Sequence, residues 1–79
     1  MLPLPLLTSR VIPALTTLAR DPVPNVRFNA AKALGAVAAR LEPGQAAVGV
    51  APTLSTLMGD KDTDVRFFAG QKAGAAGRQ

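Results

Sequence analysis

The chain has 79 residues and contains no Cys, His, Trp or Tyr. Without Cys it can form neither a disulfide nor a thiolate metal site. Without His it lacks both the commonest general base and the commonest metal ligand. The hydroxyl groups of Ser and Thr therefore have no imidazole to activate them as nucleophiles. We expect no enzyme activity, and the sequence offers no catalytic residues, no metal site and no cofactor site.

Acidic residues are few, with five Asp and Glu against nine Lys and Arg, which gives a formal net charge of +4. The basic residues are spread along the chain and do not form the focused patch that is typical of nucleic-acid binding. This distribution argues against a nucleic-acid partner, which stays an alternative. No apolar run reaches the roughly 18 residues of a membrane span, so we expect no membrane insertion.

What the sequence does contain is an internal repeat with an offset of 39 residues. Residues 11–35 align without a gap on residues 50–74, and eleven of the 25 aligned positions are identical. The chain is therefore two copies of one unit. The resulting division is an N-terminal extension (1–9), a first repeat (10–41), a second repeat (42–77) with a weak last helix, and a tail (78–79). A targeting segment is the alternative interpretation of the extension.

Each unit predicts two helices, because its apolar residues recur at spacings of three and four. The helices are expected at about 10–20, 24–41, 45–58 and from about residue 62 onward. Pro24 suits the first turn of the second helix, and we place Pro13 in the first turn of the first helix. The residues expected to face inward are Ile12, Leu15, Leu18, Ala19, Val26, Ala30, Ala33, Leu34, Val37, Leu41, Val50, Leu54, Leu57 and Met58.

The last predicted helix has a cap at its start and glycines near its end. Asp62 or Thr63 can accept a hydrogen bond from a free backbone N–H and so cap it. Gly70, Gly74 and Gly77 each cost about 1 kcal/mol relative to Ala in a helix interior. We therefore expect this helix to fray.

Paired helices with a period of about 40 residues are typical of α-solenoids of the HEAT or armadillo type. The predicted fold class is all-α, an α-solenoid of two HEAT-type helical hairpins that forms a fragment of an α-α superhelix. Two units are fewer than the three or so that such arrays need to bury their faces. We therefore expect neighbouring repeats or self-association to cover the ends.

The same acidic–basic pair occurs in both copies, as Asp21 with Arg27 and as Asp60 with Arg66. A catalytic or anion-binding pair is one interpretation. Recurrence at the same repeat position favours a structural ladder, because a catalytic pair is needed only once. In this ladder each Asp accepts hydrogen bonds from turn N–H groups, and an Arg of the neighbouring unit bridges to it with its planar fork of donors.

Two further motifs could bear on function. The alternating carboxylates of DKDTD (60–64) start like a calcium loop, but that loop needs Gly at its sixth position and Glu at its twelfth, where this chain has Val65 and Gln71. We reject the calcium site. Phe28 and Phe67 are equivalent and are expected to pack between helices or repeats, whereas Phe68 occurs in one copy only and is the better candidate for a specific partner contact.

The segments DPVPNVRFNAAKAL (21–34) and DKDTDVRFFA (60–69) resemble the last two HEAT repeats of the scaffolding A subunits of protein phosphatase 2A. The resemblance covers about residues 11–73 and includes turn residues as well as apolar ones. That family forms a horseshoe of HEAT repeats without catalytic activity. Its carboxy-terminal repeats hold the phosphatase catalytic subunit through the turn inside each repeat, and other repeats hold a regulatory subunit.

The resemblance implies a scaffold that binds a serine/threonine phosphatase catalytic subunit, and a regulatory subunit as a second partner, in the cytoplasm and also the nucleus. The turn residues that would face the partner are Asp21, Pro22, Val23, Pro24, Asn25, Asp60, Lys61, Asp62, Thr63 and Asp64. The ladder beneath them would consist of Asp21, Arg27, Asp60 and Arg66. The alternatives are an adaptor fragment of a transport or chromatin protein, and an incomplete gene product without independent function.

Overall fold

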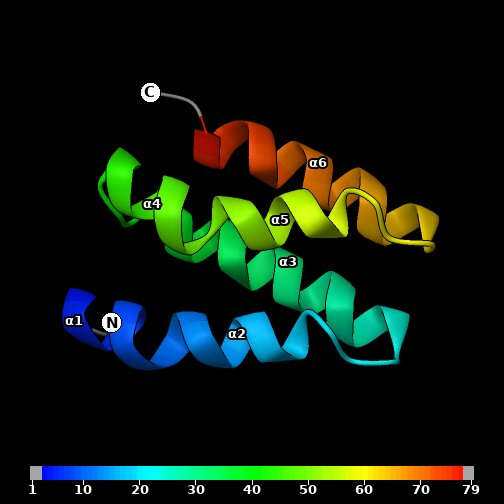
Figure 1. The fold of residues 1–79 in the computed structure, drawn as a ribbon, viewed down its shortest axis with the longest axis horizontal. Helices are drawn as coiled ribbons and strands as arrows, with labels where there is room; N and C mark the ends of the chain where they lie inside the picture. Colours follow the sequence, from blue (N-terminus) through cyan, green and yellow to red (C-terminus); the bar gives the residue numbers. More distant parts are fainter. Residues whose placement is uncertain (1–2, 78–79) are drawn as a thin grey trace.

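The computed structural model describes residues 3–77, which form helices and connecting loops without any strand (Figure 1). None of the helices in this range is long and apolar enough to cross a membrane. The elements in chain order are α1 (Leu4–Leu6), the π-helical segment η1 (Leu7–Val11), α2 (Ile12–Leu18), α3 (Pro24–Ala38), α4 (Pro43–Gly49), α5 (Ala51–Leu57) and α6 (Thr63–Gly77).

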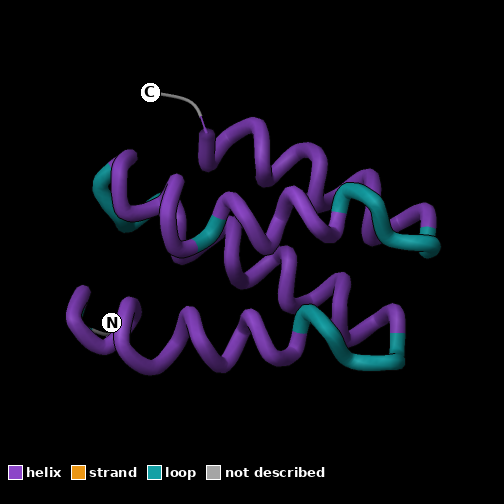
Figure 2. The backbone as a smooth tube through the Cα atoms, viewed as in Figure 1, coloured by secondary structure: helices purple, strands orange, loops and turns teal. Residues whose placement is uncertain are grey.

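The elements form two helical hairpins that stack on each other. The first hairpin consists of α1, η1 and α2 followed by α3, and the second of α4 and α5 followed by α6. In Figure 1, α2 lies along one edge of the molecule and α6 along the opposite edge, with α3 and α5 between them. The turns inside the two hairpins lie at the same end of the molecule (Figure 2). This arrangement brings two copies of one turn side by side.

The helical structure at the start of each hairpin is interrupted near a proline. Helical structure begins at Leu4 in the first hairpin and at the equivalent Pro43 in the second. Helical structure therefore begins before the expected start at Arg10, whereas Pro13 lies in the first turn of α2 as predicted. Proline lacks an N–H and its ring crowds the carbonyl four residues earlier. Accordingly the helix is π-helical just before Pro13, and before Pro52 it breaks at Val50, whose φ is −117°.

The second helices begin as the sequence predicted. α3 starts at Pro24, where a missing N–H costs little. The Asp62 carboxylate accepts a hydrogen bond from the Val65 N–H at 3.1 Å, so Asp62 caps α6. α3 ends at Ala38, earlier than the expected Leu41. α6 extends to Gly77, its expected fraying stays a prediction, and the predicted tail (78–79) lies outside the described residues.

The core lies between the two hairpins and includes most of the residues predicted to face inward. Its members include Ile12, Ala19, Ala30, Leu34, Val37, Leu41, Val50, Leu54 and Leu57. Leu18 and Met58 were also expected there, but they are 44% and 46% exposed. Helical spacing identifies one face of a helix, and burial at the edge of that face depends on whether a neighbouring hairpin covers it.

Gly70 offers a test of the weak last helix. A Cβ at Gly70 would meet no other atom within 4 Å, so Gly70→Ala should stabilise α6 by about 0.5–1 kcal/mol in urea unfolding. Gly35 in α3 is the matched control, because a Cβ there would lie 2.6 Å from Lys72 Cδ. Gly35→Ala should gain less, since Lys72 must then move. Equal gains would show that packing around Gly35 is looser than in the structure.

Candidate functional site: the paired turns

Each turn is closed by the carboxylate of its Asp. Asp21 Oδ1 accepts a hydrogen bond from the Val23 N–H at 2.9 Å, and Asp60 Oδ1 accepts one from the Asp62 N–H at 2.9 Å. A carboxylate that bonds the backbone two residues later fixes the turn conformation locally. The recurrent Asp therefore has the same local geometry in both hairpins.

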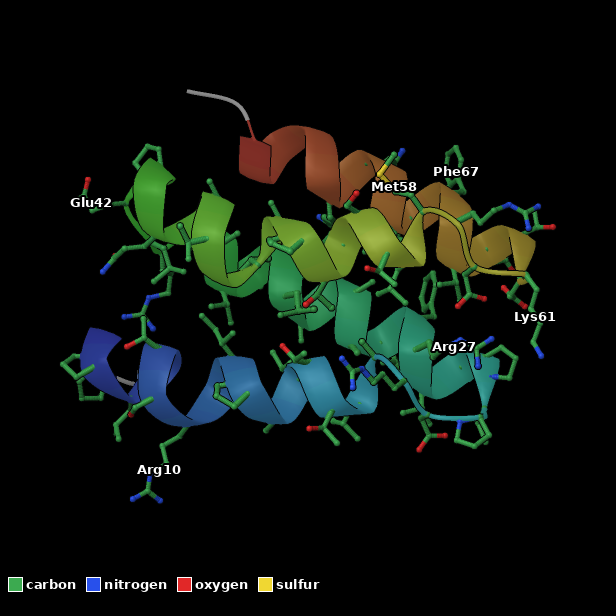
Figure 3. The ribbon with its side chains drawn as sticks, viewed as in Figure 1. Arg10, Arg27, Glu42, Met58, Lys61 and Phe67 are labelled. Atoms are coloured by element: carbon green, nitrogen blue, oxygen red, sulfur yellow. The ribbon has the colours of Figure 1, made fainter. Side chains whose placement is uncertain are left out.

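Arg27 joins the first turn to the second. Its Nη1 donates to the carbonyl oxygens of Asp21 at 2.8 Å and Pro22 at 3.0 Å. Its Nε and Nη2 donate to the two carboxylate oxygens of Asp60, at 2.7 and 3.0 Å. This two-pronged geometry is the one in which Arg binds a carboxylate most strongly. One side chain thus holds the backbone of one turn and the carboxylate of the next. Figure 3 shows Arg27 at the end of the molecule where the turns lie.

The pair formed by Arg27 and Asp60 is shielded from water, with side-chain exposures of 8% and 10%. The hydrogen bonds from Arg27 hold the pKa of the Asp60 carboxyl below its ordinary value, against the opposing effect of burial. The hydrogen bond to Asp60 likewise raises the pKa of the Arg27 guanidinium, so the pair stays ionised. No buried side-chain N or O within the described part of the chain lacks a hydrogen-bond partner.

Arg66 repeats only half of this pattern. Its Nη1 donates to the carbonyl oxygen of Asp60 at 2.8 Å, as Arg27 does to that of Asp21. Its Nη2 donates to Thr63 Oγ1 at 3.3 Å, and no carboxylate within residues 3–77 binds it. Of the four residues expected in the ladder, the structure therefore brings Arg27, Asp60 and the backbone of Asp21 together, and it leaves Arg66 exposed on its own turn.

The outer sides of the two turns form a groove of about 680 Å³. It is lined by Val23, Pro24, Asn25 and Phe28 from the first hairpin and by Asp62, Asp64, Phe67 and Phe68 from the second. Five of the ten predicted partner-facing residues thus line it. Pro22, Lys61 and Thr63 are exposed beside it, and the carboxylates of Asp21 and Asp60 are engaged in the turns. The lining thus combines three aromatic rings with two carboxylates.

Of the two equivalent phenylalanines, Phe28 packs between the hairpins as predicted, and Phe67 does not. Phe28 packs against Phe68, with ring centroids 4.9 Å apart, and Lys72 Nζ lies 5.1 Å from the Phe68 ring centroid, where a cation is attracted to the ring. Phe68 is therefore a contact between the hairpins that also lines the groove, and its role in a partner contact stays a prediction. Phe67, expected to be packed, is 68% exposed. The expectation for Phe67 fails because no helix within residues 3–77 covers that side of α6.

The groups that line the groove are apolar side chains, an amide and carboxylates. No group of three His, Cys, Asp or Glu in the described part of the chain is arranged to hold a metal ion. Asp60 is paired with Arg27 and bonded to the Asp62 N–H, which leaves it no role as a base. The lining of the groove offers apolar area and negative charge.

Protonation of Asp60 should weaken the link between the turns. Because its folded-state pKa lies below the unfolded value of about 3.9, its stabilising effect is complete above about pH 5 and is lost as the pH falls through the folded-state pKa. Thermal melts at decreasing pH should show the gap in Tm between the wild type and Asp60→Asn narrowing below about pH 4. A gap that stays constant to about pH 2 would contradict this role of the carboxylate.

The HEAT repeat family model matches residues 11–41, the segment that runs from the end of η1 through α2 and α3. A HEAT repeat is thus detected over this segment. The predicted fold class, an all-α solenoid of two HEAT-type hairpins, is confirmed by that match together with the helical structure. HEAT repeats typically belong to non-enzymatic scaffolds. The comparison with curated proteins gives no match for the chain.

Proposed function

We propose that this chain is a non-enzymatic scaffold segment that binds another protein through the outer surface of its two intra-repeat turns. The observation that carries the proposal is the difference between the inner and outer sides of the two turns. Their inner sides are fixed by Arg27 and Asp60, while their outer sides stay exposed around one groove. A surface held rigid before binding loses less conformational entropy when a partner docks.

The proposed partner is the catalytic subunit of a serine/threonine protein phosphatase, with a regulatory subunit as a further partner. The support is the resemblance of both turn sequences to the phosphatase 2A scaffold, together with the HEAT repeat found over residues 11–41. Such a partner would place the protein in the cytoplasm or the nucleus. Both turns lie at one end of the molecule, so one partner could contact both at once (Figure 2).

The groove suggests which features of the partner matter. Phe67 is 68% exposed and Val23 is 51% exposed, so apolar partner side chains would gain most by covering them. Asp62 and Asp64 in the lining favour a partner with Lys or Arg beside that apolar patch. Aromatic residues that become fully covered are frequent energetic centres of protein interfaces.

The test is a calorimetric titration of the purified chain with a purified phosphatase 2A catalytic subunit. Val23→Asp should weaken binding by about tenfold or more, because it places charge in the apolar groove. Val48→Asp is the matched control. Val48 is 80% exposed on α4, at some distance from the turns, so its replacement should change the affinity less than about twofold.

Circular dichroism must first show that each variant keeps the helical content of the wild type. Absence of binding by the folded wild type would overturn the phosphatase as partner. Equal losses for Val23→Asp and Val48→Asp would overturn the turns as the binding surface, even if a phosphatase binds.

A further inference from the structure

Equivalent positions in the two hairpins differ in burial, and the differences mark two uncovered faces. Leu57 is 3% exposed, whereas its counterpart Leu18 is 44% exposed. In the opposite sense, Ala19 is 5% exposed and its counterpart Met58 is 46% exposed. Each buried member lies on the side of its hairpin that the other hairpin covers.

We call the uncovered side of the first hairpin, marked by Leu18, the head face. The uncovered side of the second hairpin, marked by Met58 and Phe67, is the tail face. Figure 3 shows Met58 and Phe67 together on the side of the molecule that faces away from α2. Phe67 is 68% exposed there, while its counterpart Phe28 packs against the next hairpin.

The polar ladder is open at the same two faces. Asp21 closes its own turn as Asp60 does, but no Arg within residues 3–77 reaches the Asp21 carboxylate. Arg66 donates a hydrogen bond to the backbone of its own turn as Arg27 does, but no carboxylate within residues 3–77 pairs with its guanidinium. The head face thus presents an acceptor of the kind that Arg27 finds in Asp60, and the tail face presents the matching donor.

We propose that copies of this chain associate head to tail, with the tail face of one copy on the head face of the next. Arg66 then binds Asp21 of the next copy, as Arg27 binds Asp60 within one copy. Met58 and Phe67 cover the region of Leu18 and Asn29, as Ala19 and Phe28 cover that of Leu57 and Phe68. A second copy is the occupant because both halves of this contact are present in one chain and the existing hairpin contact is their template.

This association shares Phe67 with the groove proposed for phosphatase binding, so a copy seated on the tail face would compete with that partner for Phe67. It has two physical consequences. The contact joins different faces of the two copies, so it does not close on itself and can continue into longer stacks. It is weaker than the contact inside the chain, because Asn29 stands where the second hairpin has Phe68. Stacking would also extend the row of turns in one direction.

The first test is sedimentation velocity of the wild-type chain over a wide concentration range at low salt. The mean mass should rise with concentration, and added salt should weaken the rise because the Arg–Asp contact is partly exposed. Val48→Asp, which is on neither face, should behave like the wild type. A wild-type mass that stays that of a monomer to millimolar concentration would overturn the proposal.

The decisive test mixes two variants. Asp21→Arg blocks the head face, and Phe67→Asp blocks the tail face. Each alone should stay monomeric where the wild type associates. An equimolar mixture should form a dimer and nothing larger, because only the intact tail of one variant can meet the intact head of the other.

Leu18→Asp is a second head-face variant that leaves the Asp21 turn bond in place, and it should give the same result if Asp21→Arg lowers helical content. Association of either single variant at wild-type strength would show that another surface is used. A mixture that remains monomeric would likewise overturn the head-to-tail contact.

Discussion

Leu57→Ala should destabilise the protein by about 2–5 kcal/mol, whereas Leu18→Ala at the equivalent position should cost less than about 1 kcal/mol. Leu57 is 3% exposed because the first hairpin covers it, and Leu18 is 44% exposed. Removing buried methyl groups loses their transfer free energy and leaves a cavity, while an exposed Leu loses little. Urea unfolding of both variants at micromolar concentration measures the difference.

The comparison is stringent because the two leucines have the same residue type, helix position and repeat position. A domain of this size has a total stability of roughly 4–12 kcal/mol, so the loss at Leu57 is a large part of it. Equal costs at the two positions would mean that the hairpins do not stack as described. A fall in the urea m-value of Leu57→Ala would indicate a partly unfolded native state.

Arg27→Ala should lower the Tm by roughly 10 °C or more, and Arg66→Ala by no more than about 3 °C. Removal of Arg27 leaves the shielded Asp60 carboxylate without its partner and frees the carbonyls of Asp21 and Pro22. Arg66 is exposed, so water can replace its hydrogen bonds. Thermal melts followed by far-ultraviolet circular dichroism provide the comparison.

A double variant separates the contribution of the Arg27–Asp60 ion pair from the cost of leaving one of its charges unpaired. Arg27→Met combined with Asp60→Leu removes both charges, and it should recover part of the stability that Arg27→Ala loses, because no unpaired carboxylate remains. Similar Tm values for Arg27→Ala and Arg66→Ala would show that the contact between the turns contributes nothing. A double variant that is less stable than Arg27→Ala would point instead to the turn carbonyls as the main contribution.

Much of the fold follows from the 39-residue offset. Once the two copies are aligned, helical spacing predicts the paired helices, and local chemistry predicts that Pro24 opens α3 and that Asp62 caps α6. These features depend on residues close together in sequence. The start at Leu4 was missed because residues 4–10 share no identity with their counterparts 43–49, so the alignment gave no sign of a helix there.

Burial at the ends of the stack could not be predicted in this way. Leu18 and Leu57 are the same residue in the same pattern, as are Phe28 and Phe67, yet one of each pair is covered and the other exposed. The spacing of apolar residues identifies the apolar face of a helix, but it does not show which hairpin packs against that face. The order of the hairpins decides which copy is covered, and that order becomes visible only when the hairpins are placed in space.

The candidate site, too, could be predicted from the sequence only in part. Recurrence of Asp and Arg predicted that these residues are architectural, but Arg27 and Arg66 differ in every contact beyond their own turn. The groove between the turns was not predicted, because it arises from residues of both hairpins. The alignment did contain a sign of this groove, because it places Val23, Pro24 and Asn25 of the first turn in register with Asp62, Thr63 and Asp64 of the second.

The stacking of the two hairpins can be observed most directly by nuclear magnetic resonance. The aromatic region of the spectrum contains only three phenylalanines, since Trp, Tyr and His are absent. The ring protons of Phe28 and Phe68 should show a cross-peak in a nuclear Overhauser spectrum, because their centroids are 4.9 Å apart and they belong to different hairpins. Its presence in a dilute sample would support the stacked arrangement of the repeats. Its absence from a chain that is helical by circular dichroism would contradict that arrangement.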